Sequence, residues 1–108
     1  MPPTISDSSV TYAQRVVARV RGIRSSGEPL CAQSQALTRE LQTATERLVR
    51  LDEAIERRCE RGRSEPDWMR FGREQLAGSV RYLANAHSVT ERRLKQTSFA
   101  AKSHNESH

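Results

Sequence analysis

The sequence predicts an all-α protein organised around a long antiparallel helical hairpin. Mostly apolar residues recur alternately three and four positions apart from Leu30 to Ile55, and no Gly or Pro interrupts the chain from Leu30 to Arg61. Short breaks containing Gly, Pro and Ser flank this stretch. A period of 3.5 residues is typical of a coiled-coil helix, whose narrow apolar seam packs against another helix. The seam consists of Leu30, Ser34, Leu37, Leu41, Ala44, Leu48, Leu51 and Ile55.

The composition leaves little material for a hydrophobic core. The 108 residues suit a single domain, but only 35% of them are hydrophobic and 5% are aromatic. A two-helix hairpin encloses little interior, and small scaffolds commonly depend on oligomerisation for stability. We therefore expect a homodimer in which a second copy completes a four-helix core.

The N-terminal part of the chain predicts an arm followed by a short helix. Residues 1–9 are polar and contain Pro and Ser, so we expect a flexible arm with a helix N-cap among its serines and Asp7. We predict an amphipathic helix over 10–24. The β-branched residues leave a strand as an alternative, although no second strand is visible to pair with it. The apolar side of this helix contains Ala13, Val16, Val17, Val20 and Ile23.

The first break, at 25–29, leads into a long helix that we predict over 29–62. Gly27 suits the end of the preceding helix, and Pro29 suits the first turn of the next one. The surface of the long helix is rich in Arg, Glu and Gln, which are good helix formers.

The second break, at 61–66, leads into a third helix that we predict over 65–96. Ser64 is a suitable N-cap, Pro66 fits the first turn, and Asp67 stands in capping-box position. The polar residues that follow predict a disordered tail over 97–108. The predicted apolar face of the third helix contains Met69, Gly72, Leu76, Ser79, Val80, Leu83, Ala86, Thr90 and Leu94.

A connection this short makes the two long helices antiparallel neighbours. Their apolar faces then provide the contacts within the hairpin and between copies. The residues predicted to mediate self-association are Leu37, Leu41, Leu48, Leu51, Ile55, Leu76 and Leu83.

The charge pattern indicates a nucleic-acid backbone as one class of partner. The net charge is +5, and the basic residues are 16 Arg and 2 Lys. Arg suits planar, two-pronged contacts with phosphate. If folding about Ser64 turns the flanks of both long helices the same way, a basic strip runs along the hairpin and could follow duplex RNA, which is recognised by shape and backbone. The predicted phosphate contacts are Arg47, Arg50, Arg57, Arg61, Arg70, Arg73 and Arg81.

The same arginines also fit a solvated charged face, because an acidic stripe of Glu46, Glu53, Glu56 and Glu60 lies on the long helix. Arg excess can also reflect a GC-rich or overlapping coding sequence. An apolar cluster of Trp68, Met69 and Phe71 follows the second break. We interpret it as a plug that seals the hairpin tip or receives the first helix, with a docking site for a protein partner as the alternative.

No motif in the sequence indicates a reaction, and we expect neither an enzyme, a cofactor nor a metal site. His87 and Glu91 stand one helical turn apart, but two ligands are a weak metal signal. Cys31 and Cys59 fall about 40 Å apart on one helix, too far for a disulfide within the chain. The absence of an apolar run of about 18 residues and of a secretory signal leads us to expect a cytoplasmic protein without a membrane span.

The architecture from about Val10 to Gln96 resembles the helical RNA-silencing suppressors of insect nodaviruses, and the resemblance implies dimers whose basic flanks lie along duplex RNA. The outline is also similar to small WXG-type secreted hairpins, although Gly72 stands two places later than the Gly of their Trp-x-Gly turn. We predict a sequence-tolerant nucleic-acid binder. The alternative is a protein-interaction module, such as an adaptor, secretion chaperone or regulatory subunit, that uses the leucine seam and the Trp68 cluster.

Overall fold

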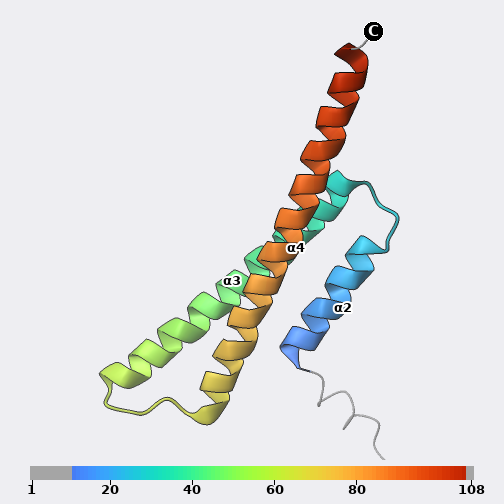
Figure 1. Cartoon of the computed structure of the whole chain (residues 1–108). Helices are drawn as coiled ribbons and strands as arrows, with labels where there is room; N and C mark the ends of the chain where they lie inside the picture. The colour runs from blue at the N-terminus through green and yellow to red at the C-terminus, as the bar shows by residue number, and fades with distance from the viewer. Residues whose placement is uncertain (1–10, 107–108) are drawn as a thin grey trace, which may run out of the picture.

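The computed structural model describes the backbone of residues 11–106 and the side chains of residues 11–98. This part of the chain contains three helices and no strand: α2 (Tyr12–Arg24), α3 (Leu30–Glu60) and α4 (Asp67–Glu106). Helices α3 and α4 form an antiparallel pair that crosses at an angle, and α2 lies beside them (Figure 1). The all-α class, the long hairpin and the shorter leading helix are confirmed.

Helix α2 begins at a capping box. The Thr11 hydroxyl accepts a hydrogen bond from the Gln14 backbone N–H at 3.2 Å, and the Gln14 side chain accepts one from the Thr11 N–H at 2.9 Å. Two backbone donors that a helix start leaves without partners are thereby satisfied. The N-caps predicted among residues 6–9 lie outside the described part of the chain, and Thr11 takes that role.

Helix α3 ends in a Schellman motif. The backbone N–H of Arg63 donates to the carbonyl of Arg58 at 2.9 Å, and that of Gly62 donates to Cys59 at 3.0 Å. This geometry requires a left-handed residue, and Gly62 supplies it with φ +73°. The chain therefore reverses at a defined point, which positions α4 against α3.

Helix α4 differs from the prediction at both ends. It begins at Asp67, and the Pro66 carbonyl accepts hydrogen bonds from Met69 and Arg70, so Ser64 stands too far ahead to cap it. Helix α4 also continues to Glu106, into the tail that we predicted to be disordered, and its last turns project beyond α3 (Figure 1). The polar residues after Gln96 include no Gly or Pro to end the helix.

The core lies where α2 crosses the hairpin. Each helix contributes two of its most buried residues, and the side chains of Val20, Leu37 and Leu83 have no exposed surface. Burying each such side chain contributes about 1.5–3 kcal/mol. Nearer the hairpin tip, Ile55 and Met69 are also buried, outside this main core. The residues of the main core are Val16, Val20, Leu37, Ala44, Leu83 and Ala86.

The predicted apolar sides of the three helices all face inward. Every residue predicted on the apolar face of α4, from Met69 to Leu94, is buried or half-buried, and so is every residue of the α3 seam. Gly72 allows a close approach, because a Cβ there would lie 3.4 Å from Cδ2 of Leu51. Packing within one chain thus accounts for the 3.5-residue pattern without a partner.

The molecule is a thin slab. Its Cα atoms extend 69 × 43 × 14 Å, and its accessible surface is 7983 Å². A compact monomer of 12.2 kDa exposes about 6,100 Å². The difference follows from the elongated, thin shape of the hairpin and does not locate an interface, so dimerisation stays a prediction.

The two cysteines are free and exposed near the two ends of α3. Within the described residues, none of the helices has the length and apolar character needed to cross a membrane.

Candidate nucleic-acid interface

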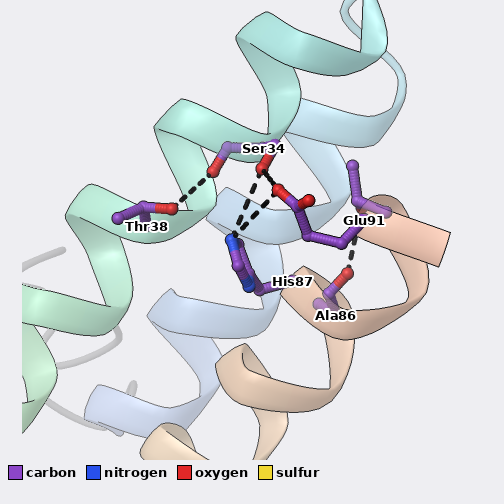
Figure 2. A network of polar contacts seen from close by, with 6 residues as sticks. Ser34, Thr38, Ala86, His87 and Glu91 are labelled. Carbon is purple, nitrogen blue, oxygen red and sulfur yellow. Dashed lines mark hydrogen bonds and ion pairs between the residues drawn. The ribbon is translucent and has the colours of Figure 1, made fainter. Parts of the chain in front are cut away.

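A polar cluster bridges α3 and α4 inside the seam. Ser34 is buried, and its hydroxyl donates a short hydrogen bond to Oε1 of Glu91 and lies 3.4 Å from Nε2 of His87. The same Nε2 lies 3.6 Å from Glu91 Oε1. Figure 2 shows the three side chains converging between the helices.

This cluster does not have the geometry of a hydrolytic triad. A triad needs the serine proton to pass to one imidazole nitrogen while a carboxylate holds the other. Here one nitrogen of His87 faces both Ser34 and Glu91, and the serine hydroxyl already donates to the carboxylate. Among the described residues no group of three or more His, Cys, Asp or Glu could hold a metal. The arrangement instead links two helices and fixes their relative position.

The arginines of α3 share one side of the helix. At about 100° per residue, Arg47 and Arg58 stand nearly on one line three turns apart, and the other arginines between 47 and 61 lie within about 80° of Arg47, all to one side of it. We call Arg47, Arg50, Arg57, Arg58 and Arg61 the basic flank. The acidic side chains of this segment, Asp52, Glu53, Glu56 and Glu60, occupy the other side of α3.

The basic flank lies on the side of the hairpin that α2 covers. The Arg47 guanidinium carbon lies 5.3 Å from the centroid of the Tyr12 ring, a cation–π contact between α3 and the start of α2. Further along the same side of α3, Glu40 forms an ion pair with Arg19 of α2 at 3.3 Å. Toward the tip, beyond Tyr12, α2 no longer covers this side.

The predicted arginines of α4 do not join the basic flank. Arg73 pairs with Asp52 at 3.7 Å and with Glu65 at 4.0 Å, so it lies on the acidic side of α3. Arg70 and Arg81 are exposed and stand three turns apart at the back of α4, away from its apolar face. The seven predicted arginines therefore form separate groups, and only the four between Arg47 and Arg61, on α3 and at its C-cap, lie together.

The position of these arginines around α4 explains this outcome. Arg73 and the line of Trp68, Phe71 and Gln75 lie on opposite sides of the apolar face of α4, and only the aromatic line borders the basic flank.

The level at which the two helices meet then decides which acidic residue Arg73 contacts. We expected Arg73 beside Arg57, from a fold about Ser64. The contacts of Asp52 with Arg73 and of Ser34 with Glu91 are instead centred near Gly62, where the Schellman motif reverses the chain. The earlier turn shifts α4 by more than one helical turn relative to α3.

The cluster after the second break is only partly a plug. Met69 is 8% exposed and packs inside the hairpin, but Trp68 is 68% exposed and Phe71 is 54% exposed. The interpretation as a plug is therefore wrong for the two aromatic residues. The sequence contains a signal for this exposure. Trp68, Phe71 and Gln75 are three and four residues apart and form a line beside the apolar face of α4, not on it.

A hollow of about 250 Å³ lies between the basic flank and this aromatic line. We call it the tip hollow. Tyr12 lies at its edge toward α2, where the backbone N–H of Ala13 donates to Oε1 of Gln75 at 3.3 Å. The sequence interpretation included a cluster at Trp68, Met69 and Phe71 that receives the first helix, and the start of α2 does lie beside Phe71. The hollow is lined by Tyr12, Arg47, Phe71, Gly72, Gln75 and Leu76.

The residues predicted to mediate self-association fall into two groups. Leu37 and Leu83 have no exposed surface and Ile55 is 6% exposed, so these three pack within the chain and are closed to a partner. The remaining four, Leu41, Leu48, Leu51 and Leu76, are half-buried.

No protein-family model, curated protein or solved structure matches the chain.

Proposed function

We propose that this chain is a non-enzymatic basic helical protein that binds nucleic-acid backbones without strong sequence preference. The observation that carries this proposal is the separation of charge on α3. Between residues 47 and 61, five arginines occupy one side of the helix and four acidic residues the other. The arginines present a positive edge about 21 Å long, which Glu46 and Glu53 border at one turn from Arg50 and Arg57.

Duplex RNA is the target that fits this edge best. A helix of 31 residues is a rigid rod whose arginines keep fixed spacings. Double-stranded RNA offers a regular array of phosphates and is recognised mainly through its shape and backbone. Contacts of this kind fix the position of the protein but read no bases, so binding tolerates many sequences.

A homodimer strengthens the proposal because it presents two basic flanks. The thin slab and the half-buried leucines of the hairpin leave surface for a second copy. When one basic flank of a dimer binds a long duplex, the second flank is held close to the same duplex at a high effective concentration. The dimer therefore binds that duplex more tightly than one copy does.

A salt titration of duplex RNA binding tests the proposal. The triple variant Arg50→Gln, Arg57→Gln, Arg61→Gln removes three charges from the basic flank. The control variant Arg21→Gln, Arg92→Gln, Arg93→Gln removes three charges elsewhere; all six side chains are exposed. The slope of log affinity against log salt should fall by about 2–3 in the first variant and change less in the second. Absence of duplex binding by the unmodified protein at about 50 mM salt would refute the proposal.

The exposed aromatic residues favour a second candidate function. Trp68 and Phe71 stand side by side on α4 with more than half of their surface in solvent. Large exposed aromatics are common anchors of protein interfaces. A protein-interaction module would dock its partner on these side chains, and its affinity for that partner would depend little on salt.

A further inference from the structure

We propose that the tip hollow receives one unpaired nucleobase, so that the protein binds a duplex with a single-stranded end more tightly than a blunt duplex. The inference rests on the proposed backbone-binding function and names the form of nucleic acid that the site recognises.

The dimensions of the hollow favour a single flat ring. Its volume of about 250 Å³ is below the roughly 300–1,000 Å³ of clefts that hold drug-sized ligands. The hollow is a shallow depression on the surface, lined by Arg47 of α3, Tyr12 of α2 and four residues of α4. A ring can therefore enter it from solvent and lie against Phe71, with Arg47 beside it.

The lining has the chemistry that a nucleobase requires. Phe71 offers an exposed aromatic face for stacking. The Arg47 guanidinium already lies over one ring, Tyr12, and a guanidinium plane also stacks on bases. Gln75 contributes an amide whose NH₂ group can donate to a base edge, while its oxygen accepts from Ala13.

The position of the hollow connects it to the phosphate contacts. Arg47 lines the hollow and is also the first residue of the basic flank. A backbone that follows the flank from Arg61 to Arg47 thus reaches the hollow at the end of its path. A paired base cannot enter, because it is held within the duplex stack, whereas a base in an overhang is free to turn out.

The chain contains a single tryptophan, Trp68, which stands one helical turn from Phe71 toward the tip. It provides a built-in reporter, because a base that stacks near Phe71 will change its fluorescence. A blunt duplex on the basic flank also passes near Trp68, because the flank and the aromatic line border the same hollow, so the informative quantity is the difference between the two duplexes.

The test compares three ligands of equal length in base pairs or nucleotides: a blunt RNA duplex, the same duplex with a three-nucleotide overhang, and the single strand. The overhang should raise the affinity about five- to hundredfold, the range that stacking one base represents. The overhang duplex and the single strand should change the Trp68 fluorescence more than the blunt duplex does, and Phe71→Ala should remove that difference. The variant Phe71→Ala should remove the advantage of the overhang while leaving blunt-duplex affinity within about twofold.

Two control variants accompany Phe71→Ala. Phe71→Tyr keeps an aromatic ring and should retain the higher affinity for the overhang duplex. Val49→Ala removes a similarly exposed apolar side chain from the acidic side of α3 and should leave the affinities for all three ligands unchanged. Equal affinity for blunt and overhang duplexes would overturn the inference and leave the proposed function standing. An advantage that survives Phe71→Ala would also overturn it. Failure to bind any of the three ligands would overturn both proposals, and capture of a peptide at Trp68 in that case would favour the interaction module.

Discussion

Arg47 of α3 lies over the ring of Tyr12 at 5.3 Å and so ties the first turn of α2 to the middle of the hairpin. Each single substitution, Arg47→Met or Tyr12→Leu, should lower the free energy of unfolding. A double-mutant cycle should give a coupling of about 0.5–1 kcal/mol, the range for an exposed cation–π pair. Urea denaturation followed by circular dichroism measures it. Zero coupling would mean that α2 is held by its apolar side alone.

Thr11→Ala should destabilise the protein by about 1 kcal/mol, because it removes the hydroxyl that accepts from the Gln14 backbone N–H. Thr43→Ala is the matched control. The Thr43 hydroxyl only donates back to the Arg39 carbonyl within α3, and alanine is the better helix former, so stability should stay equal or rise slightly. Equal losses in the two variants would count against the capping box.

Two glycine substitutions should act in opposite directions. Gly62→Ala forces a side chain into φ +73° and should cost about 1–2 kcal/mol. Gly22→Ala lies within α2, where an added Cβ meets no atom within 4 Å, and should stabilise the protein by about 0.5–1 kcal/mol. Thermal unfolding of both variants gives the comparison. Tolerance of alanine at Gly62 would show that the turn after α3 has another conformation.

Truncation of the core should separate folding from self-association. Leu83→Ala should cost about 2–5 kcal/mol, because Leu83 is fully buried and leaves a cavity. Leu41→Asp with Leu48→Asp alters half-buried residues and should abolish the predicted dimer. Light scattering gives the mass, and circular dichroism reports whether the helices persist. Helical, unchanged oligomers of the double variant would exclude this surface as the interface.

Ser34→Ala tests the polar cluster. It removes the hydroxyl that donates to Glu91, and the carboxylate is partly exposed and can turn to water. The expected loss is therefore about 0.5–1.5 kcal/mol, the net value of one hydrogen bond. Ser34→Leu should cost more, because the site is buried and a larger side chain must displace its neighbours. A gain in stability with alanine would mean that the cluster sets helix position at the expense of stability.

The helices were predictable because their signals are local and repeated. The residues from Leu30 to Ile55 repeat often enough to define both a helix and its buried side, and the same holds for Met69 to Leu94. Helix ends depend on single interactions and were less predictable. The start of α2 depends on one Thr11–Gln14 pair, and the end of α4 has no breaking residue to mark it.

The candidate interface was only partly predictable, because it depends on how segments meet. The sequence places Arg47, Arg50, Arg57 and Arg61 on one side of a helix by spacing alone. The partner of Arg73 depends on the position of the turn at Gly62, which shifts one long helix past the other. Likewise, no periodic pattern brings Tyr12 beside Phe71, since the path of the loop between α2 and α3 decides where the start of α2 lies along the hairpin.

The exposed thiols of Cys31 and Cys59 sit near opposite ends of a single rigid helix. Any disulfide that forms under oxidising conditions must therefore join different molecules. In a dimer, a disulfide between Cys31 of one copy and Cys59 of the other would indicate that the two α3 helices run antiparallel. A disulfide between the same cysteine of both copies would indicate that they run parallel. The chain thus has two attachment points of its own for measuring how its copies are oriented.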